Sequence, residues 1–313
     1  SYEYFMQVAK NSDSSMLPKN SGESVDAFLA RIKPIVNDIK YQPKLVNLAP
    51  NIDNVAASSV NFYEGVTQKE VEAFYSRFDS KINAPAWGLN SKLMKDNGQV
   101  IEKVWKVGGM YSPAIEKIVG WLEKAASVAE NDAQKKSIEL LVQYYKTGDL
   151  KVYDDYSIAW VADTASRIDV VNGFTEVYLD PINKKGSFEG IVSMKDQAAT
   201  MRITAISSQA QWFEDNSPLM PEHKKKEVKG ITAKAITVIV ESGDAAPNTP
   251  IGINLPNNEW IRKDHGSKSV SLSNIIYSYN AASAKGGVLD EFGLNDTIKQ
   301  RIKQYGNLAA DLH

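Results

Sequence analysis

Apolar residues in the first half of the chain recur every three to four positions, which is the spacing of one face of an α-helix. This pattern predicts helices over 24–40, 65–78, 111–131 and 132–149. Pro34 falls inside the first of these segments and is expected to kink or break it. The first half of the chain is therefore predicted to be mainly helical.

Local signals indicate where several of these helices begin and end. Thr67 is followed three positions later by Glu70, which is the pattern of a capping box. Ser112 is expected to cap the third helix, with Pro113 at its first helical position. Gly148 is expected to end the fourth helix, because glycine accommodates the left-handed backbone that follows many helices.

The apolar pattern changes to alternation near residue 150, which is typical of β-strands. Strands are expected over 152–163, 169–181, 186–196 and 230–244. The second and third of these strands are separated by a short polar segment that ends in glycine. We therefore expect them to form a hairpin.

The remaining segments are predicted to be helices and one loop. Helical spacing recurs over 198–216, 271–286 and 294–313, and a proline-rich loop is expected over 245–260. This order of elements predicts an α+β fold, with helical segments around a small antiparallel or mixed, barrel-like sheet. At 313 residues the chain exceeds the usual size of one domain, which favours a two-lobed molecule.

Charge and composition exclude several classes of function. The chain has 36 Lys and Arg residues against 38 Asp and Glu residues, a net charge of −2. This balance disfavours nucleic acid or a membrane surface as a partner bound through bulk charge. No cysteine is present, which excludes disulfides, cysteine-ligated zinc and thiol catalysis. A cytoplasmic location is favoured, and a periplasmic one stays open.

The motifs of common catalytic centres are absent from the sequence. The three histidines, His223, His265 and His313, are scattered, and none has a second histidine or a glutamate at the spacing of a zinc-binding helix. There is no phosphate-binding loop and no Gly-x-Ser-x-Gly motif. The sequence therefore offers no candidate catalytic residue and no candidate metal ligand.

Groups that could bind a peptide do occur. Glu176 and Tyr178 are two positions apart, so they point to the same face of the expected strand, and Glu189 is expected across the hairpin. Asn254 and Asn257 flank a stiff Leu-Pro segment, and their amides suit the backbone of another peptide. A carboxylate beside such amides would pair well with an ammonium group.

Spacing alone leaves two other interpretations open. Glu176 could face solvent while the two asparagines only form turns. Glu176 and Asp180 also have the residue types of a glycosidase acid pair, a feature that any two carboxylates near a strand share.

Longer segments resemble the dipeptidyl peptidase III family of zinc metallopeptidases, and in particular its bacterial members. The resemblance covers roughly residues 60–313 and preserves the order of several motifs. These motifs are NFYEGVTQKEVEAFY (61–75), DYSIAWVADTASRIDVVNGFTEVYLDP (155–181), KKGSFEGIVSMKD (184–196), SSQAQWFEDNSP (207–218) and TPIGINLPNNEWIRKDHGSKSVSLSNI (249–275).

The resemblance implies an exopeptidase that removes dipeptides from the N-terminus of short peptides, with two lobes around a wide cleft. It implies that Glu176 binds the free amino group of the peptide and that Tyr178 assists binding. The peptide backbone would be held by a loop, and a cleft arginine would lie nearby. The residues at these positions are Gly252, Asn254, Asn257 and Arg262.

One departure from the family pattern limits what this chain is expected to do. Family members carry a zinc helix, His-Glu-x-x-Gly-His, and a second acidic motif that supplies the third ligand, and neither occurs here. Zinc is therefore expected in the full-length enzyme and not in this chain, which would be a part of the peptidase that is inactive alone. The alternatives are a metal-free peptide-binding module and a structural interaction protein without a ligand.

Because the zinc helix is missing, we expect one complete lobe and one incomplete lobe. We expect a mainly helical part over 1–150 and a strand-rich barrel lobe over 151–196 and 230–284. Segments 197–229 and 285–313 would belong to a second, incomplete lobe. The sequence makes no prediction about the oligomeric state.

Overall fold

A computed structural model describes residues 2–37, 45–228, 231–246, 249–282 and 295–300. Its helices are α1 (Tyr2–Asn11), η1 (Ser14–Met16), α2 (Val25–Asn37), α3 (Gln68–Tyr75), α4 (Ser112–Ser127), α5 (Asp132–Thr147), α6 (Leu150–Ala162), α7 (Gln197–Ser207), α8 (Ala210–Asp215), η2 (Pro221–His223), α9 (Glu259–Asp264) and α10 (Ser273–Ala282). Its strands are β1 (Tyr63–Glu64), β2 (Ser91–Asp96), β3 (Gln99–Val104), β4 (Ile168–Glu176), β5 (Ser187–Lys195), β6 (Ile231–Gly243), β7 (Gly252–Leu255) and β8 (Ser267–Leu272).

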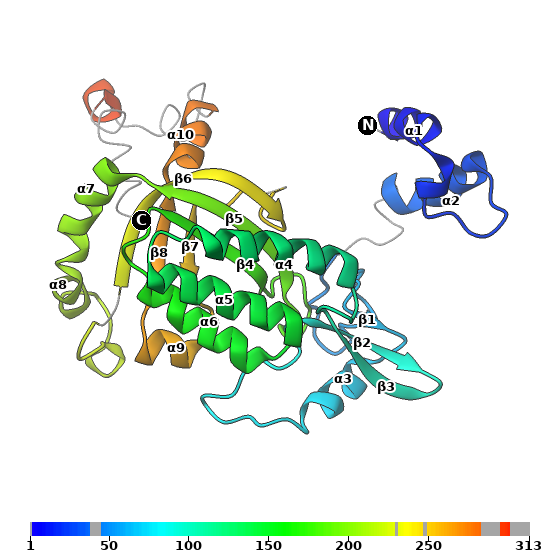
Figure 1. Ribbon diagram of the computed structural model, residues 1–313, viewed down its shortest axis with the longest axis horizontal. Coiled ribbons are helices and arrows are strands. Elements are labelled where there is room, and N and C mark those ends of the chain that lie inside the picture. The colour runs from blue at the N-terminus through cyan, green and yellow to red at the C-terminus, as the bar shows by residue number, and fades with distance from the viewer. Residues whose placement is uncertain (1, 38–44, 229–230, 247–248, 283–294, 301–313) are drawn as a thin grey trace.

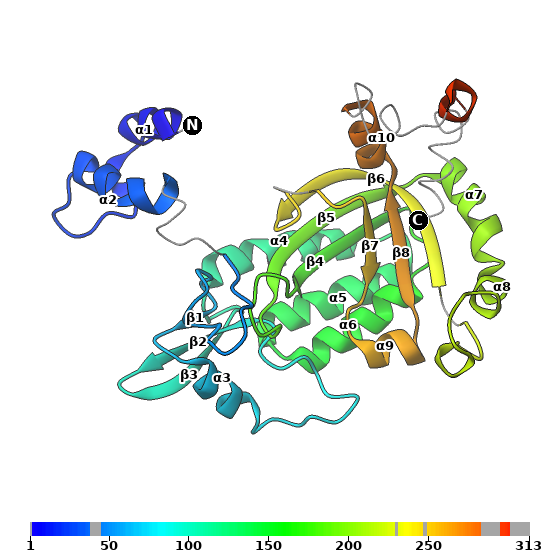
Figure 2. The same cartoon turned by 180° about the vertical axis from the view of Figure 1, so that it is seen from behind.

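A mixed five-stranded sheet forms the centre of the fold, with strand order β4-β5-β6-β8-β7. The pairs β4–β5, β5–β6 and β7–β8 are antiparallel, and β6–β8 is parallel. Figure 2 shows the five strands side by side. The predicted α+β class and mixed sheet are confirmed. Within the described residues β4 and β7 are the edges of this sheet, so a closed barrel is not confirmed.

Helices α4, α5 and α6 cover one face of the five-stranded sheet (Figure 1). They bury one continuous apolar cluster in which aromatic rings of the helices meet a ring from the sheet. Tyr145 on α5 lies edge-on to Phe174 on β4, with ring centroids 6.4 Å apart. Burial of such large side chains contributes roughly 1.5–3 kcal/mol each, so this cluster is the main support for β4.

The expected strand over 152–163 is wrong, because these residues belong to helix α6. Asp149 caps the helix: its carboxylate accepts a hydrogen bond from the Lys151 backbone N–H at 2.8 Å. The buried side chains of α6 recur at helical spacing. They are Leu150, Asp154, Tyr156, Ser157, Trp160 and Val161.

A second sheet lies in the part of the chain that is expected to be helical. Its order is β1-β2-β3, with β2 and β3 joined as an antiparallel hairpin. Asn97 and Gly98 form the hairpin turn with φ values of 47° and 79°. An Asn-Gly pair favours this type of turn because both residues tolerate positive φ. The sequence therefore contains a local signal for this hairpin, which the helical prediction leaves unused.

The predicted helix ends are confirmed in part. Thr67 and Glu70 form the expected capping box at the start of α3. Gly148 follows α5 in the left-handed conformation, with φ 72°. Ser112, in contrast, is the first residue of α4, and Tyr111 occupies the N-cap position. The Ser112 hydroxyl instead accepts a hydrogen bond from the Gly108 backbone N–H at 2.6 Å.

Several helices and loops have other boundaries in the structure than the sequence predicts. Helix α2 runs through Pro34 without ending there. The helix expected over 198–216 is divided into α7 and α8, and the loop expected over 245–260 contains β7 and the start of α9. The C-terminal helix expected over 294–313 lies outside the described residues except for 295–300. No helix in the described ranges combines the length and apolar character that crossing a bilayer requires.

The turn between β4 and β5 is held by the buried carboxylate of Asp180. It accepts hydrogen bonds from the backbone N–H groups of Lys184 at 2.8 Å and Lys185 at 2.7 Å, and from that of Ile182 at 3.1 Å. The Tyr63 hydroxyl donates to it from β1 at 2.7 Å. This carboxylate therefore fixes the turn and ties it to the small sheet.

The amine of Lys185 makes a second link between the same turn and the small sheet. It is fully buried and donates hydrogen bonds to the Tyr75 hydroxyl and, at 2.8 Å, to the Ser91 hydroxyl. Both hydroxyls donate at 2.6 Å to one oxygen of Glu102, whose charge offsets that of the amine. Burial lowers the pKa of Lys185 to about 8.

Replacing Asp180 with alanine should therefore destabilise the protein. Asp180→Ala leaves several buried donors without an acceptor, and we expect it to lower the free energy of unfolding by about 2–4 kcal/mol. Urea unfolding followed by circular dichroism measures the change. Asp155→Ala, at an exposed position on α6, is the control and should stay within about 0.5 kcal/mol of the wild type. Equal stability of the two variants would contradict the role given to Asp180.

Candidate functional site

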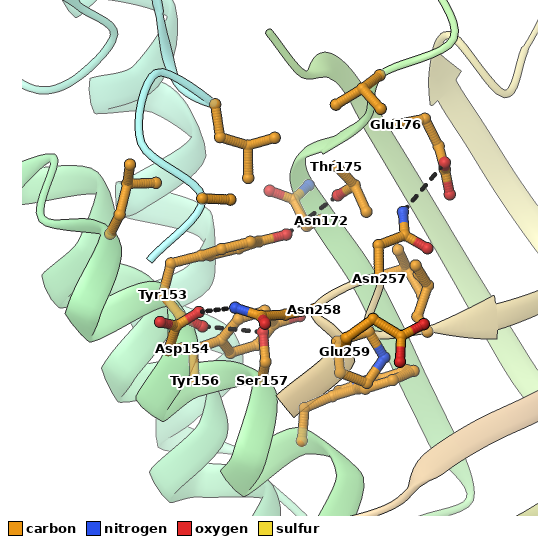
Figure 3. Close-up of a pocket in the computed structure, with 18 of the residues that line it drawn as sticks. Tyr153, Asp154, Tyr156, Ser157, Asn172, Thr175, Glu176, Asn257, Asn258 and Glu259 are labelled. Atoms are coloured by element: carbon orange, nitrogen blue, oxygen red, sulfur yellow. Dashed lines mark hydrogen bonds between the residues drawn. The ribbon is translucent and has the colours of Figure 1, made fainter. Parts of the chain in front are cut away.

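A cavity of about 400 Å³ lies between α6, the end of β4 and the segment 255–259. Figure 3 shows its polar side chains. Its walls are mainly aromatic and apolar, with a few carboxylate and amide groups, which is the composition of a ligand-binding pocket. The lining residues are Ala84, Ala86, Leu89, Leu150, Tyr153, Asp154, Tyr156, Ser157, Trp160, Val171, Asn172, Thr175, Glu176, Val177, Tyr178, Asn183, Leu255, Pro256, Asn257, Asn258 and Glu259.

Glu176 is the last residue of β4, and its carboxylate lies at this cavity. It accepts a hydrogen bond from the Asn257 side-chain amide at 3.1 Å (Figure 3). The Tyr178 hydroxyl also hydrogen-bonds to Glu176, and this bond raises the pKa of Tyr178 to about 12. Neutral groups from two segments of the chain therefore hold the carboxylate.

The expectation that Glu176 and Tyr178 share one face of a strand is wrong. The strand ends at Glu176, and Tyr178 lies in the following turn with 71% of its surface exposed. The two side chains meet because the chain turns after Val177, and not because they alternate along a strand. The shared strand face is therefore not formed, and the binding role of the two residues stays a prediction.

Glu176 lacks a charged partner in the part of the chain that the structure describes. No lysine, arginine or histidine among these residues forms an ion pair with it, whereas Glu70, Glu102 and Asp169 each lie near a lysine amine. A half-buried carboxylate is favoured by a nearby positive charge, because desolvation is costly for an unpaired charge. The side chain is therefore suited to receive a cation from a ligand.

A second carboxylate lies behind Glu176. Glu189 on β5 is opposite Gly173 in the β4–β5 register, across the hairpin as expected, and only 7% of its surface is exposed. Burial raises the pKa of Glu189 to about 7, and the charges of Glu176 and Asp244 act in the same direction. The negative charge at this end of β4 thus increases as the pH rises through neutrality.

The wall of the cavity that faces β4 comes from α6. The Tyr153 hydroxyl and the Thr175 hydroxyl form a hydrogen bond of 3.0 Å that joins α6 to β4. One residue further along α6, Asp154 accepts a hydrogen bond from the Asn258 side chain at 3.1 Å. Asp154 is 8% exposed, and burial raises its pKa to about 7.

Sequence reasoning misses these α6 residues because their segment is expected to be a strand. A helix assignment would place Tyr153, Asp154 and Ser157 on one surface, since residues three and four apart lie on the same helix face. The usable signal is the Gly-Asp pair at 148–149, in which glycine ends one helix and aspartate caps the next. The position of these α6 side chains beside Glu176 depends on tertiary packing, which the local sequence does not reveal.

Three of the six predicted binding residues, Glu176, Tyr178 and Asn257, line the cavity. The other three lie outside its lining. Gly252 and Asn254 are exposed on β7, where the Ser269 hydroxyl donates to the Asn254 side-chain oxygen at 3.5 Å. Arg262 is half-buried on α9. The structure brings Glu176 and Asn257 into contact, and the Leu255–Pro256 peptide bond that precedes Asn257 is cis.

The residues around the cavity do not fit a zinc site. A catalytic zinc ion in a peptidase is held by three protein side chains, which are usually His, Asp or Glu. Within the described ranges, no three side chains of these types gather in an arrangement that could hold a metal ion. The described side chains at the cavity therefore offer groups that can bind a ligand, and not a ligand set for zinc.

Comparison with known proteins identifies related sequences. Residues 56–305 match the family model described as Peptidase family M49. Dipeptidyl peptidase 3 of Mus musculus is 29% identical over 244 residues, which are 76% of this chain and 32% of that protein. Dipeptidyl peptidase 3 of Dictyostelium discoideum is 24% identical over 295 residues, 84% of this chain and 41% of that protein. The chain thus spans less than half the length of these relatives.

A solved structure supports the same assignment at the level of the fold. DPP III from Caldithrix abyssi superposes with a TM-score of 0.63 at 20% sequence identity. The match covers 90% of this chain and 52% of that one. Dipeptidyl-peptidase III from Corallococcus sp. strain EGB gives a TM-score of 0.59 at 24% identity, covering 73% of this chain and 42% of that one.

The raised pKa of Glu189 makes stability depend on pH in a defined direction. The folded protein holds this proton up to about pH 7, whereas the ordinary value for glutamate is 4.5. The stabilisation is therefore complete below about pH 4.5 and is lost as the pH rises through 7. In Glu189→Gln, the free energy of unfolding should fall less between pH 4.5 and 8 than in the wild type. Urea unfolding at several pH values tests this.

The control for this pH dependence is Glu139→Gln, at an exposed position on α5. It should follow the wild-type curve. Asp154 titrates in the same range and acts in the same direction, so some pH dependence remains in Glu189→Gln. A difference between wild type and Glu189→Gln that stays constant over this range would refute the assignment.

Proposed function

Because this chain belongs to Peptidase family M49, a family of zinc-dependent metallopeptidases, we propose that it carries the peptide-binding part of a dipeptidyl peptidase. The substrates would be short peptides with a free N-terminus. The observation that carries this proposal is the Glu176 carboxylate at the cavity, which is held by neutral donors and has no cationic partner within the described residues. The relatives named dipeptidyl peptidase 3 support the reaction class.

The chemistry of the site suits an α-ammonium group. An ammonium ion donates up to three hydrogen bonds, and a charge-assisted bond to a carboxylate is roughly twice as strong as a neutral one. Asn257 donates to the Oε2 atom of Glu176, and a carboxylate has about four lone-pair sites, so acceptor capacity remains for a ligand. The ionised form of Glu189 would add negative charge behind this contact.

We propose that the rest of the peptide meets β7 and α9. Gly252 and Asn254 lie on β7, which leads directly to Asn257, and they present an exposed edge. An extended peptide held at Glu176 would be able to contact these residues through its backbone. Arg262 on α9 would lie beyond them, where a carbonyl or carboxylate of the peptide could accept its hydrogen bonds.

We further propose that the zinc centre is supplied by sequence outside this chain. The chain has no His-Glu-x-x-Gly-His segment, and its relatives are more than twice its length. When bound, zinc would supply Lewis-acid activation of the reacting water and carbonyl. The residues of this chain would contribute binding and orientation of the peptide.

Replacement of Glu176 tests the proposal directly. Glu176→Gln should weaken binding of a free tetrapeptide, for example Leu-Ala-Ala-Ala, by about 2–5 kcal/mol, because one partner of a charge pair is removed. Isothermal titration calorimetry measures the affinity. The N-acetylated peptide should bind weakly to both proteins, and Glu139→Gln should bind like the wild type. Equal affinity of the wild type for the free and acetylated peptides would rule out an ammonium site.

The proposal also predicts binding without hydrolysis. This chain should release no arylamine from a dipeptidyl-arylamide, whether zinc is added or a chelator is present, since it has no His-Glu-x-x-Gly-His segment and its described residues hold no ligand set for a catalytic zinc ion. Peptide affinity should be the same with and without chelator. Hydrolysis above the rate of the buffer, or binding that requires zinc, would contradict this division of roles.

A further inference from the structure

Two consecutive asparagines at the cavity bind two different carboxylates. The Asn257 side-chain amide donates to Glu176 at the end of β4, and the Asn258 side-chain amide donates to Asp154 on α6, each at 3.1 Å. Figure 3 shows the two hydrogen bonds leaving the segment in different directions. The segment is thus held between a strand and a helix that are far from it in the sequence.

Asn258 makes this contact instead of a local one. It occupies the N-cap position of α9, where an asparagine side chain commonly accepts a hydrogen bond from the first turn of the helix. No such bond is formed at α9, and the Asn258 side chain reaches α6 instead. The helix start therefore loses a capping interaction while the link to Asp154 is kept.

Asp154 is an unusual acceptor for this link. It is 8% exposed, and Asn258 is its only side-chain hydrogen-bond donor in the described part of the chain. The charged groups nearest to it, Asp155 and Asp149, are also acidic, and burial raises its pKa to about 7. A buried carboxylate with one neutral donor is costly, so stability alone does not explain its presence.

We propose that Asp154 is a positioning residue: it holds Asn258, and thereby fixes the Asn257 amide against Glu176. Glu176 then keeps one orientation relative to the cavity, with its Oε2 atom bound to Asn257. This inference rests on the proposed binding of a peptide ammonium group by Glu176. It assigns to Asp154 no contact with the peptide.

The first test requires no ligand. In a ¹⁵N-correlated NMR spectrum of the free protein, Asp154→Ala and Asn258→Ala should both shift the side-chain amide signals of Asn257. Asp154→Asn retains an oxygen that can accept the bond from Asn258, so it should leave those signals close to their wild-type positions. Asp155→Ala, on the exposed side of α6, is the control. Unchanged Asn257 signals in Asp154→Ala and Asn258→Ala would overturn the inference.

The second test measures affinity for the free tetrapeptide Leu-Ala-Ala-Ala by calorimetry. Asp154→Ala and Asn258→Ala should each weaken binding about tenfold, as expected when the orientation of a hydrogen-bonded charged group is lost. Asp154→Asn should restore most of that affinity. Circular dichroism and thermal melting confirm that each variant is folded before it is compared.

A double-mutant cycle separates positioning from direct contact. If Asp154 acts through Asn257, then Asp154→Ala should have no further effect on affinity in an Asn257→Ala background. A full tenfold loss in that background would show that Asp154 touches the peptide itself, and would overturn the inference. If Glu176→Gln leaves peptide affinity unchanged, the proposed function fails. If Glu176→Gln weakens binding but Asp154→Ala and Asn258→Ala bind the peptide normally, only the positioning role is overturned.

Discussion

The geometry of the cavity depends on the buried carboxylate of Asp180 in the turn between β4 and β5. This side chain accepts hydrogen bonds from three backbone N–H groups of its own turn and from the Tyr63 hydroxyl. These donors satisfy the buried carboxylate, because each hydrogen bond replaces a lost contact with water. Glu176 and Tyr178 lie just before this fixed point, so their positions follow from it.

The cavity combines apolar walls with an excess of negative charge. Asp154, Glu176 and Glu259 line it, and Glu189 on β5 is close enough to Glu176 for the two charges to interact. Neutral amides and hydroxyls satisfy part of their hydrogen-bonding capacity without neutralising them. Burial is the main reason why the pKa of Asp154 and that of Glu189 are raised to about 7, and nearby carboxylates act in the same direction. A ligand that brings a positive charge would favour the ionised form of these carboxylates.

The sequence predicts elements that depend on neighbouring residues better than those that depend on packing. The same holds for the candidate site, where contacts between distant segments are not predicted. The β4–β5 hairpin, the capping box at Thr67 and the end of α5 at Gly148 are encoded locally. The Tyr and Val residues of α6 favour a strand by propensity, and packing of the helix on the sheet overrides that preference. Asp154 lies outside the motifs that carry the family resemblance, and Asn258 lies within one of them but has no role assigned by it. Their hydrogen bond joins residues 104 positions apart, and sequence spacing gives no information about such a contact.

The separation of these segments has a consequence for how the protein folds. Glu176 and Asn257 are 81 positions apart, and β8, which follows Asn257 in the sequence, lies between β6 and β7 in the sheet. Ordering such distant segments requires closing long loops, whose entropy opposes the early stages of folding. We therefore expect the pocket to form late in folding, after the central sheet has assembled.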